Sequence, residues 1–142
     1  MLMVLAIALA ISMSGCDSPS GPVSPRSGYR DRLSGVWSVI APDTVVLGTT
    51  FDVQIGTAGS NGCWRKGEDL VSQPGPLQVG IVPFDREYVG TGFCTDMVVY
   101  FQHTAPVRAS ARGTMDIAVA HLLRAVSGAD SSGAIHLSVQ VR

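Results

Sequence analysis

The sequence predicts an all-β fold, a sandwich of seven or eight short antiparallel strands. Apolar and polar residues alternate along several segments beyond residue 34, as in strands with one buried and one wet face. Glycine, proline and asparagine separate these segments, which is typical of β-sandwiches. Residues 34–142 also have the size of one domain. We therefore expect a single sandwich domain over 34–142.

The expected strands follow one another closely along this region. Ile135, Leu137, Val139 and Val141 show the clearest alternation. The segment 117–126 is rich in Ala and Leu and has some helical character, and we interpret it as a strand that runs into a loop. In chain order, the strands are expected at 36–40, 44–47, 51–55, 77–81, 96–103, 115–119 and 135–141.

Turn signals lie between the expected strands. Ser60-Asn61-Gly62 predicts a tight hairpin turn, because Asn-Gly tolerates the positive φ that such turns require. The remaining signals are at 42–43, 48–50, 73–76, 89–92 and 127–133. This spacing supports a series of short strands.

The chain opens on a nearly uninterrupted apolar run over residues 1–13. A helix needs roughly 20 residues to cross a hydrocarbon core of about 30 Å, so the run is too short to span a membrane. Its length, followed by Ser14 and Gly15, instead predicts the apolar part of an export signal, over residues 1–15. An ordinary secretory signal and a lipoprotein signal both fit this pattern.

Met13-Ser14-Gly15-Cys16 resembles the lipobox of bacterial lipoproteins, in which an aliphatic and two small residues precede a cysteine. The resemblance implies that Cys16 carries lipid, that the signal is removed just before it, and that acyl groups hold the chain on a membrane. Two or more acyl chains anchor a protein stably. The implied location is the bacterial cell envelope, facing the periplasm or the exterior.

Residues 16–33 are predicted to form a lipidated, flexible linker. The stretch is rich in Ser, Pro, Gly and Arg, so it buries too little apolar surface to offset its ordering entropy. Its expected role is to lift the domain off the bilayer. Contact of Arg26, Arg30 and Arg32 with anionic headgroups is an alternative.

Cys63 and Cys94 are expected to form a disulfide. They are the two cysteines left once Cys16 is acylated, and an exported domain folds in an oxidising compartment. Closing a loop of about 30 residues stabilises a fold by roughly 3–4 kcal/mol in the chain-entropy account. A metal or redox pair, which favours Cys-x-x-Cys spacing or nearby histidines, is the less favoured alternative.

The region from residue 40 onward resembles the immunoglobulin-like domains of small bacterial surface lipoproteins. The resemblance implies an immunoglobulin-like sandwich outside the cytoplasm and brings no catalytic residues. Trp64 directly follows the first cysteine instead of lying on the next strand, so the disulfide need not join the two sheets. The matching segments are 41–45, Gly48, 51–53, 62–63, 83–85 and 93–95.

Searches for catalytic patterns return no Gly-x-Ser-x-Gly elbow, phosphate loop or His-Glu-x-x-His helix. His103, His121 and His136 are far apart, and carboxylates gather only at 68–69 and 85–87, beside turn signals. We expect these carboxylates to be solvated, with calcium at loop ends as the alternative. No cofactor and no enzyme activity are predicted.

The charge pattern excludes nucleic acid as a partner. Ten basic and eleven acidic residues are spread along the chain, giving a formal net charge of −1 with no basic block. Most aromatic residues fall where a core needs bulk. Trp64 and Tyr88 are the candidates for an exposed recognition patch, and the segment 83–94, with Phe84 and Asp85, is the first place to look for one.

The function that these observations predict is a membrane-tethered, non-catalytic binding or assembly module. Its expected partners are the membrane, through the lipid, and another envelope protein or a glycan. A small envelope metal-binding protein or enzyme, using histidine and carboxylate side chains, is the alternative.

Overall fold

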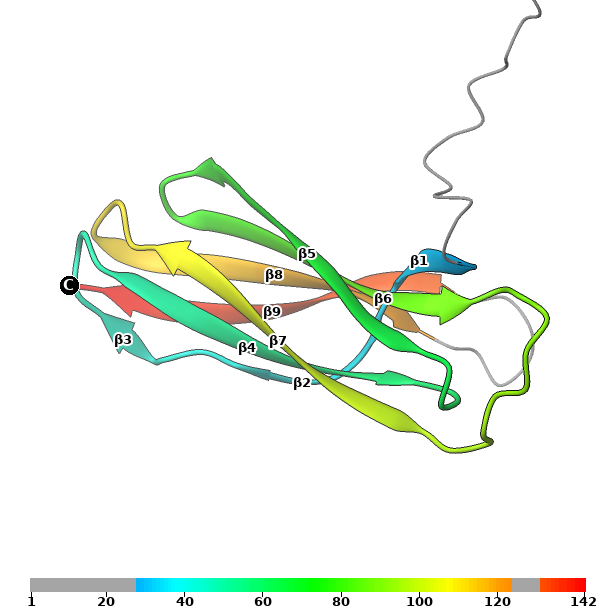
Figure 1. Cartoon of the computed structure of the whole chain (residues 1–142). Coiled ribbons are helices and arrows are strands. Elements are labelled where there is room, and N and C mark those ends of the chain that lie inside the picture. Colours follow the sequence, from blue (N-terminus) through cyan, green and yellow to red (C-terminus); the bar gives the residue numbers. More distant parts are fainter. Residues whose placement is uncertain (1–27, 124–130) are drawn as a thin grey trace, which may run out of the picture.

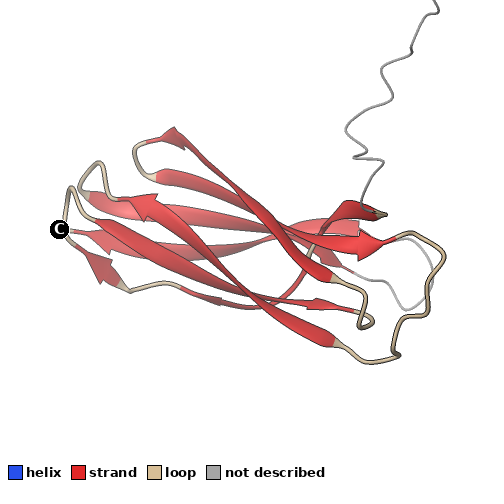
Figure 2. Cartoon of the chain, viewed as in Figure 1, coloured by secondary structure: helices blue, strands red, loops and turns tan. Residues whose placement is uncertain are grey.

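The computed structural model describes residues 28–123 and 131–142, and this part of the chain is all-β. It contains nine strands in two sheets and no helix (Figures 1 and 2). The predicted signal peptide (1–15), Cys16 and the linker up to residue 27 lie outside the described residues.

The smaller sheet has three antiparallel strands in the order β2-β4-β7. Its strands are β2 (Gly35–Ile40), β4 (Thr50–Gly59) and β7 (Val99–Arg108). The central strand, β4, pairs along its whole length with β7, from Thr50 opposite Arg108 to Gly59 opposite Val99. Pro106 lies on β7, an edge strand of this sheet, where a missing N–H is tolerated.

The larger sheet has six strands. Five of them are paired in the order β1-β6-β8-β9-β3, and the sixth, β5, also pairs with β6. Its strands are β1 (Tyr29–Leu33), β3 (Thr44–Val45), β5 (Arg65–Gly75), β6 (Gln78–Tyr88), β8 (Gly113–Leu123) and β9 (Ser131–Val141).

The larger sheet is mixed, so the prediction of a purely antiparallel fold was wrong. The pairs β6–β8 and β3–β9 are parallel, and the other pairs are antiparallel. Alternation along a strand determines which side chains are buried but says nothing about the direction of the neighbouring strand. The sequence pattern therefore predicted which strand faces are buried, but not whether neighbouring strands run parallel or antiparallel.

Two strands were not predicted. The last five residues of the expected linker, Tyr29–Leu33, form β1 and pair with β6, so the folded domain begins before residue 34. The edge strand β5 carries Lys66, Glu68, Asp69 and Pro74. Charges and proline protect edge strands from aggregation, and they also give the sequence the composition of a loop.

The turn at Asn61-Gly62 exists, but the hairpin prediction was wrong. It joins β4 to β5, which belong to different sheets and do not pair with each other. A Cβ at Gly62 would collide with the hydroxyl of Thr95, and the Gly62 N–H donates to the Thr95 carbonyl at 2.9 Å. Gly62 is thus required by close packing rather than by a positive φ.

The core lies between the two sheets and follows the predicted alternation. Val53 and Ile55 of β4 face Ile81 of β6, and all three are fully buried. The segment with helical character is a strand, β8, as far as Leu123, and the expected loop beyond it lies outside the described residues. Other fully buried members of the core include Ala105, Met115, Ile117 and Val119.

The two ends of the sandwich differ. β1 begins at the end that carries the β6–β7 connection, whereas the C-terminal Arg142 and the β3–β4 turn lie at the opposite end (Figure 1). Within the described residues, no helix has the length and hydropathy needed to cross a membrane.

Candidate functional site

The four predicted binding residues do not form one surface. Trp64 is only 5% exposed, so the prediction of an exposed Trp64 was wrong, and its side chain packs against Gly59 of β4. Tyr88, at the end of β6, is half-buried and makes an edge-to-face contact with Tyr29, with ring centroids 5.3 Å apart.

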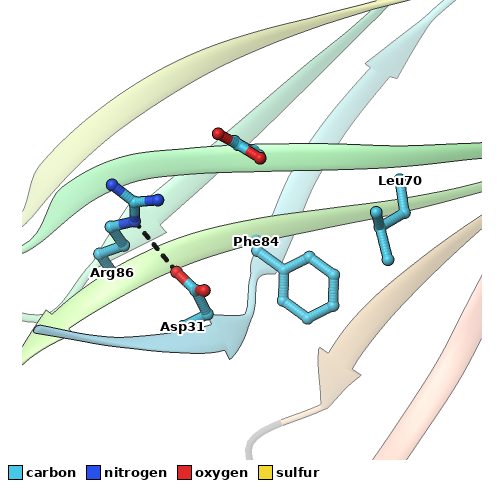
Figure 3. Close-up of a pocket in the computed structure, with 5 residues that line it drawn as sticks. Asp31, Leu70, Phe84 and Arg86 are labelled. Carbon is cyan, nitrogen blue, oxygen red and sulfur yellow. Dashed lines mark hydrogen bonds and ion pairs between the residues drawn. The ribbon is translucent and has the colours of Figure 1, made fainter. Parts of the chain in front are cut away.

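Phe84 and Asp85 point to opposite faces of β6, as neighbouring strand residues do. Phe84 lines a surface pocket of about 250 Å³ together with Asp31, Glu68, Leu70 and Arg86 (Figure 3). Arg86 Nε lies 3.1 Å from Asp31 Oδ1 across this pocket. Both partners are well exposed, so this ion pair contributes little to stability.

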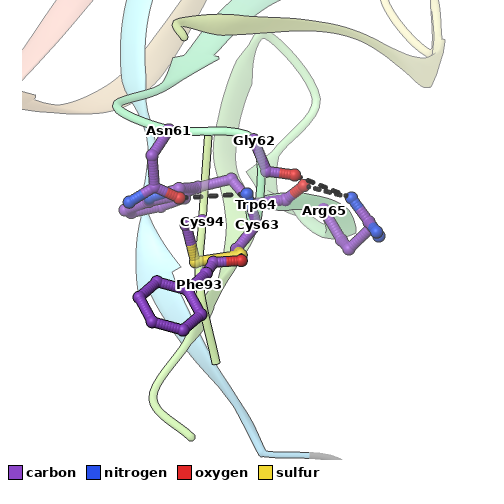
Figure 4. The surroundings of a disulfide bond; sticks show 7 residues. All are labelled: Asn61, Gly62, Cys63, Trp64, Arg65, Phe93 and Cys94. Atoms are coloured by element: carbon purple, nitrogen blue, oxygen red, sulfur yellow. Dashed lines mark hydrogen bonds between the residues drawn. A yellow bond between two sulfur atoms is a disulfide. The ribbon is translucent and has the colours of Figure 1, made fainter. Parts of the chain in front are cut away.

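The predicted disulfide between Cys63 and Cys94 is present, with Cα atoms 5.2 Å apart (Figure 4). Cys63 lies in the β4–β5 connection and Cys94 in the β6–β7 connection. Each of these connections passes from one sheet to the other. The bond therefore joins two loops at one end of the sandwich instead of crossing the core.

Asp85 and Asp69 belong to a buried polar cluster around His103, so the prediction that the carboxylates at 68–69 and 85–87 are solvated was wrong for these two residues. His103 Nε2 lies 3.1 Å from Asp85 Oδ1 and 3.1 Å from Thr57 Oγ1. Its other nitrogen, Nδ1, lies 2.7 Å from Asp69 Oδ1, an ion-pair distance without the alignment of a hydrogen bond. His103, Asp85 and Thr57 are fully buried.

Two opposing effects act on the pKa of the Asp85 carboxyl group. Burial raises the pKa of its carboxyl group, whereas polar contacts from His103, Thr57 and Ser34 lower it. The contacts outweigh burial, and the pKa lies below its ordinary value. Carboxylates only accept hydrogen bonds, so in the contact between His103 Nε2 and Asp85 Oδ1 the ring N–H is the donor.

This cluster joins the two sheets and is closed to substrates. His103 and Thr57 come from the smaller sheet, while Asp69 and Asp85 come from the larger one. No surface of the His103 ring is exposed, so no ligand reaches it in this structure. Across 28–123 and 131–142, no group of three His, Cys, Asp or Glu side chains is arranged to hold a metal ion.

The other two histidines lie apart from this cluster. His121 is half-buried near the end of β8. His136 is exposed on β9, and its Nδ1 lies 3.2 Å from Asp116 Oδ1 of β8. The three histidines therefore do not converge.

An aromatic pair that the sequence analysis missed lies on the outer face of the smaller sheet. Trp37 is 60% exposed and Tyr100 is 69% exposed. Their rings meet edge to face, with centroids 6.0 Å apart and planes at 82°. Two aromatic rings in mutual contact thus remain open to solvent.

A β-bulge places Trp37 on this face. The register between β2 and β4 shifts between Val36 and Ser38, so Trp37 is the extra residue of its strand. Its indole lies over Gly56, where a Cβ would collide with the ring, and Nε1 donates to the Thr57 carbonyl at 3.2 Å. Simple alternation does not account for bulges, so the outward position of this tryptophan was not predicted.

Uncharged polar side chains surround the aromatic pair. Gln102 lies beside Tyr100 on the same face of β7, and it pairs across the sheet with Gly56. Gln54 and Thr104 form the next row, and both are exposed. We call the set Trp37, Ser38, Gln54, Tyr100, Gln102 and Thr104 the aromatic face. Formal charges on β4 and β7 begin only beyond it, at Asp52 and Arg108.

Comparisons of the chain with protein-family models, with curated proteins and with solved structures give no match.

Proposed function

We propose that this protein is a membrane-anchored, non-catalytic binding module of the cell envelope, and that the aromatic face binds a neutral oligosaccharide. The exposed contact between Trp37 and Tyr100 on an uncharged sheet face is the observation that carries the proposal. The anchor is the lipid on Cys16, as the lipobox resemblance implies.

The chemistry of the aromatic face suits a sugar. A sugar ring presents C–H groups that pack against aromatic rings, and hydroxyl groups that need both donors and acceptors. Trp37 and Tyr100 offer the rings, while the carboxamides of Gln54 and Gln102 offer donors and acceptors in one group. The absence of formal charge among these residues favours a neutral ligand over an anionic one.

The aromatic face is held in place before any ligand arrives. The hydrogen bond from Trp37 to Thr57, the packing of the indole on Gly56 and the edge contact with Tyr100 all restrict the indole. A ligand therefore orders few side chains on binding, which reduces the entropic cost of association.

The immunoglobulin-like classification is part of this proposal. The chain crosses between the sheets soon after β1, since β2 pairs with β4 in the smaller sheet and β3 pairs with β9 in the larger one. Ala41, Pro42 and Asp43 carry the chain between them. This crossing from β2 to β3 supports the resemblance, and the parallel β6–β8 pair distinguishes this chain from antibody domains.

The test is a binding titration of the lipidated chain in detergent. The probes are neutral tetramers of N-acetylglucosamine, glucose and mannose, with an acidic tetrasaccharide as a comparison. We expect one neutral probe to bind, and we expect Trp37→Ala and Tyr100→Ala each to weaken that binding at least tenfold. Phe93→Ala, which removes an exposed aromatic ring elsewhere, is the matched control and is expected to change nothing.

Two outcomes would contradict the oligosaccharide proposal. One is that no neutral probe binds, and the other is that Trp37→Ala binds as well as the wild type. A purified protein partner whose binding depends on Trp37, with no sugar bound, would instead assign the aromatic face to protein recognition.

A further inference from the structure

The β6–β7 connection forms an apolar tip at one end of the sandwich. Phe93 is completely exposed, and Val89, Met97 and Val98 are 52%, 61% and 50% exposed. We call these four side chains the apolar tip. Exposed apolar side chains gathered in one connection are typical of a membrane or protein interaction site.

A disulfide and a backbone hydrogen bond attach the β6–β7 connection, which carries the tip, to the β4–β5 connection. Cys94 follows Phe93 directly and is bonded to Cys63, and Gly62 N–H donates to the carbonyl of Thr95 (Figure 4). In Figure 4 the ring of Phe93 points away from the other labelled side chains. The disulfide therefore holds the tip in an exposed position.

Two exposed cations follow Cys63 of the disulfide closely in the chain. Arg65 and Lys66, the only lysine of the chain, begin β5 next to the disulfide. Arg65 Nη1 donates to the carbonyls of Gly62 and Trp64. The β6–β7 connection contains one charged residue, Asp96. Apolar side chains next to cations are the combination that binds the interface of an anionic bilayer.

The tip and the start of the described chain lie at the same end of the sandwich (Figure 1). Eleven residues separate Cys16 from Gly28. A chain of this length spans about 40 Å at full extension. A lipid on Cys16 therefore keeps this end of the domain within that distance of the bilayer, which raises the effective concentration of membrane around the tip.

We propose that the apolar tip inserts into the interfacial region of the same bilayer that holds the lipid anchor. The proposal rests on the membrane anchor of the proposed function. Insertion orients the domain with the disulfide end toward the membrane and the β3–β4 turn away from it. The aromatic face then runs along the side of a domain with a defined orientation.

The test measures the depth of the tip in the lipidated, full mature chain reconstituted in vesicles of phosphatidylcholine and phosphatidylglycerol. Phe93→Trp places a fluorophore on the tip, and Val46→Trp places one on an exposed residue at the opposite end. We expect brominated lipids to quench the added Trp of Phe93→Trp at least twofold more than that of Val46→Trp. Equal quenching would overturn the proposal.

A second comparison separates this proposal from the anchor itself. Flotation with the vesicles shows whether the wild type is anchored, and Cys16→Ala is the variant without lipid. A wild type that does not float with the vesicles would refute the proposed function as well. With the anchor intact, Phe93→Trp combined with Met97→Asp should lose most of its quenching while still floating. Unchanged quenching in that variant would also contradict insertion, and folding is checked by circular dichroism.

Discussion

At the scale of single residues, the most consequential finding is that Asp85 and His103 hold the two sheets together. Each is fully buried, and each has its partner on the other sheet. Removing one partner of a buried polar pair leaves the other group buried without its partner, which costs far more than removing an exposed pair. The chain contains both kinds of aspartate–histidine pair.

This difference gives a matched prediction. Asp85→Asn should lower the free energy of unfolding by about 3–5 kcal/mol. Asp116→Asn, which removes the exposed partner of His136, should lower it by less than about 1 kcal/mol. Denaturant unfolding of both variants measures the comparison, and equal losses would show that the buried pair is not important for stability.

The pKa of Asp85 predicts the effect of acid. Because its pKa is lowered in the folded state, the charged carboxyl stabilises the fold above the unfolded-state pKa of about 3.9. That contribution is lost as the pH falls from there through the folded-state pKa. Thermal unfolding of the wild type between pH 6 and pH 3 should therefore show a steeper loss below about pH 4 than Asp85→Asn does. Parallel curves would count against this assignment.

Sequence reasoning could have located His103 but not Asp85. Tyr100 and Gln102 alternate with Phe101 and His103, so the period of two already places His103 inside. Asp85 lies in a polar run with Arg86 and Glu87 that has the composition of a solvated turn. Only the position of His103 on the facing sheet explains why a carboxylate is tolerated there.

At the scale of elements, the strands with one apolar face were predictable and the polar edge strands were not. Met115, Ile117 and Val119 on β8 determine a buried face by themselves. β1 and β5 are strands because their backbones pair with β6, and their sequences show no alternation of apolar and polar residues. The bulge at Trp37 likewise depends on the register with β4, which no local pattern specifies.

The disulfide also acts at this scale, because it connects two loops that carry no regular structure. Replacing Cys63 and Cys94 together by Ser should lower the free energy of unfolding by about 2–5 kcal/mol, since the unfolded chain gains freedom. Chemical denaturation checks this value. A loss of under about 1 kcal/mol would mean that the bond constrains only the tip and not the fold.

At the scale of the whole molecule, the structure has two surfaces with different chemistry. The aromatic face is neutral and lies on the side of the smaller sheet, whereas the apolar tip lies at the end where the chain enters the domain. Under the two proposals, one protein would contact a membrane and a ligand at the same time.

The lipid anchor on Cys16 predicts how the whole protein partitions between water and detergent. The mature protein should partition into the detergent phase, and Cys16→Ala should remain in the aqueous phase, because a chain without acyl groups has no stable anchor. Phase separation in a cloud-point detergent measures this. A water-soluble wild type would contradict the anchored architecture.

The central claim, that the aromatic face binds a neutral oligosaccharide, is tested most directly by the accessibility of Trp37. The chain has two tryptophans, and Trp37 is exposed while Trp64 is buried. Acrylamide should therefore quench mainly Trp37, and Trp37→Phe identifies its signal. We expect saturation with the tetrasaccharide that binds to protect Trp37 from quenching. Full quenching of Trp37 at saturation would place the ligand elsewhere and contradict binding at the aromatic face.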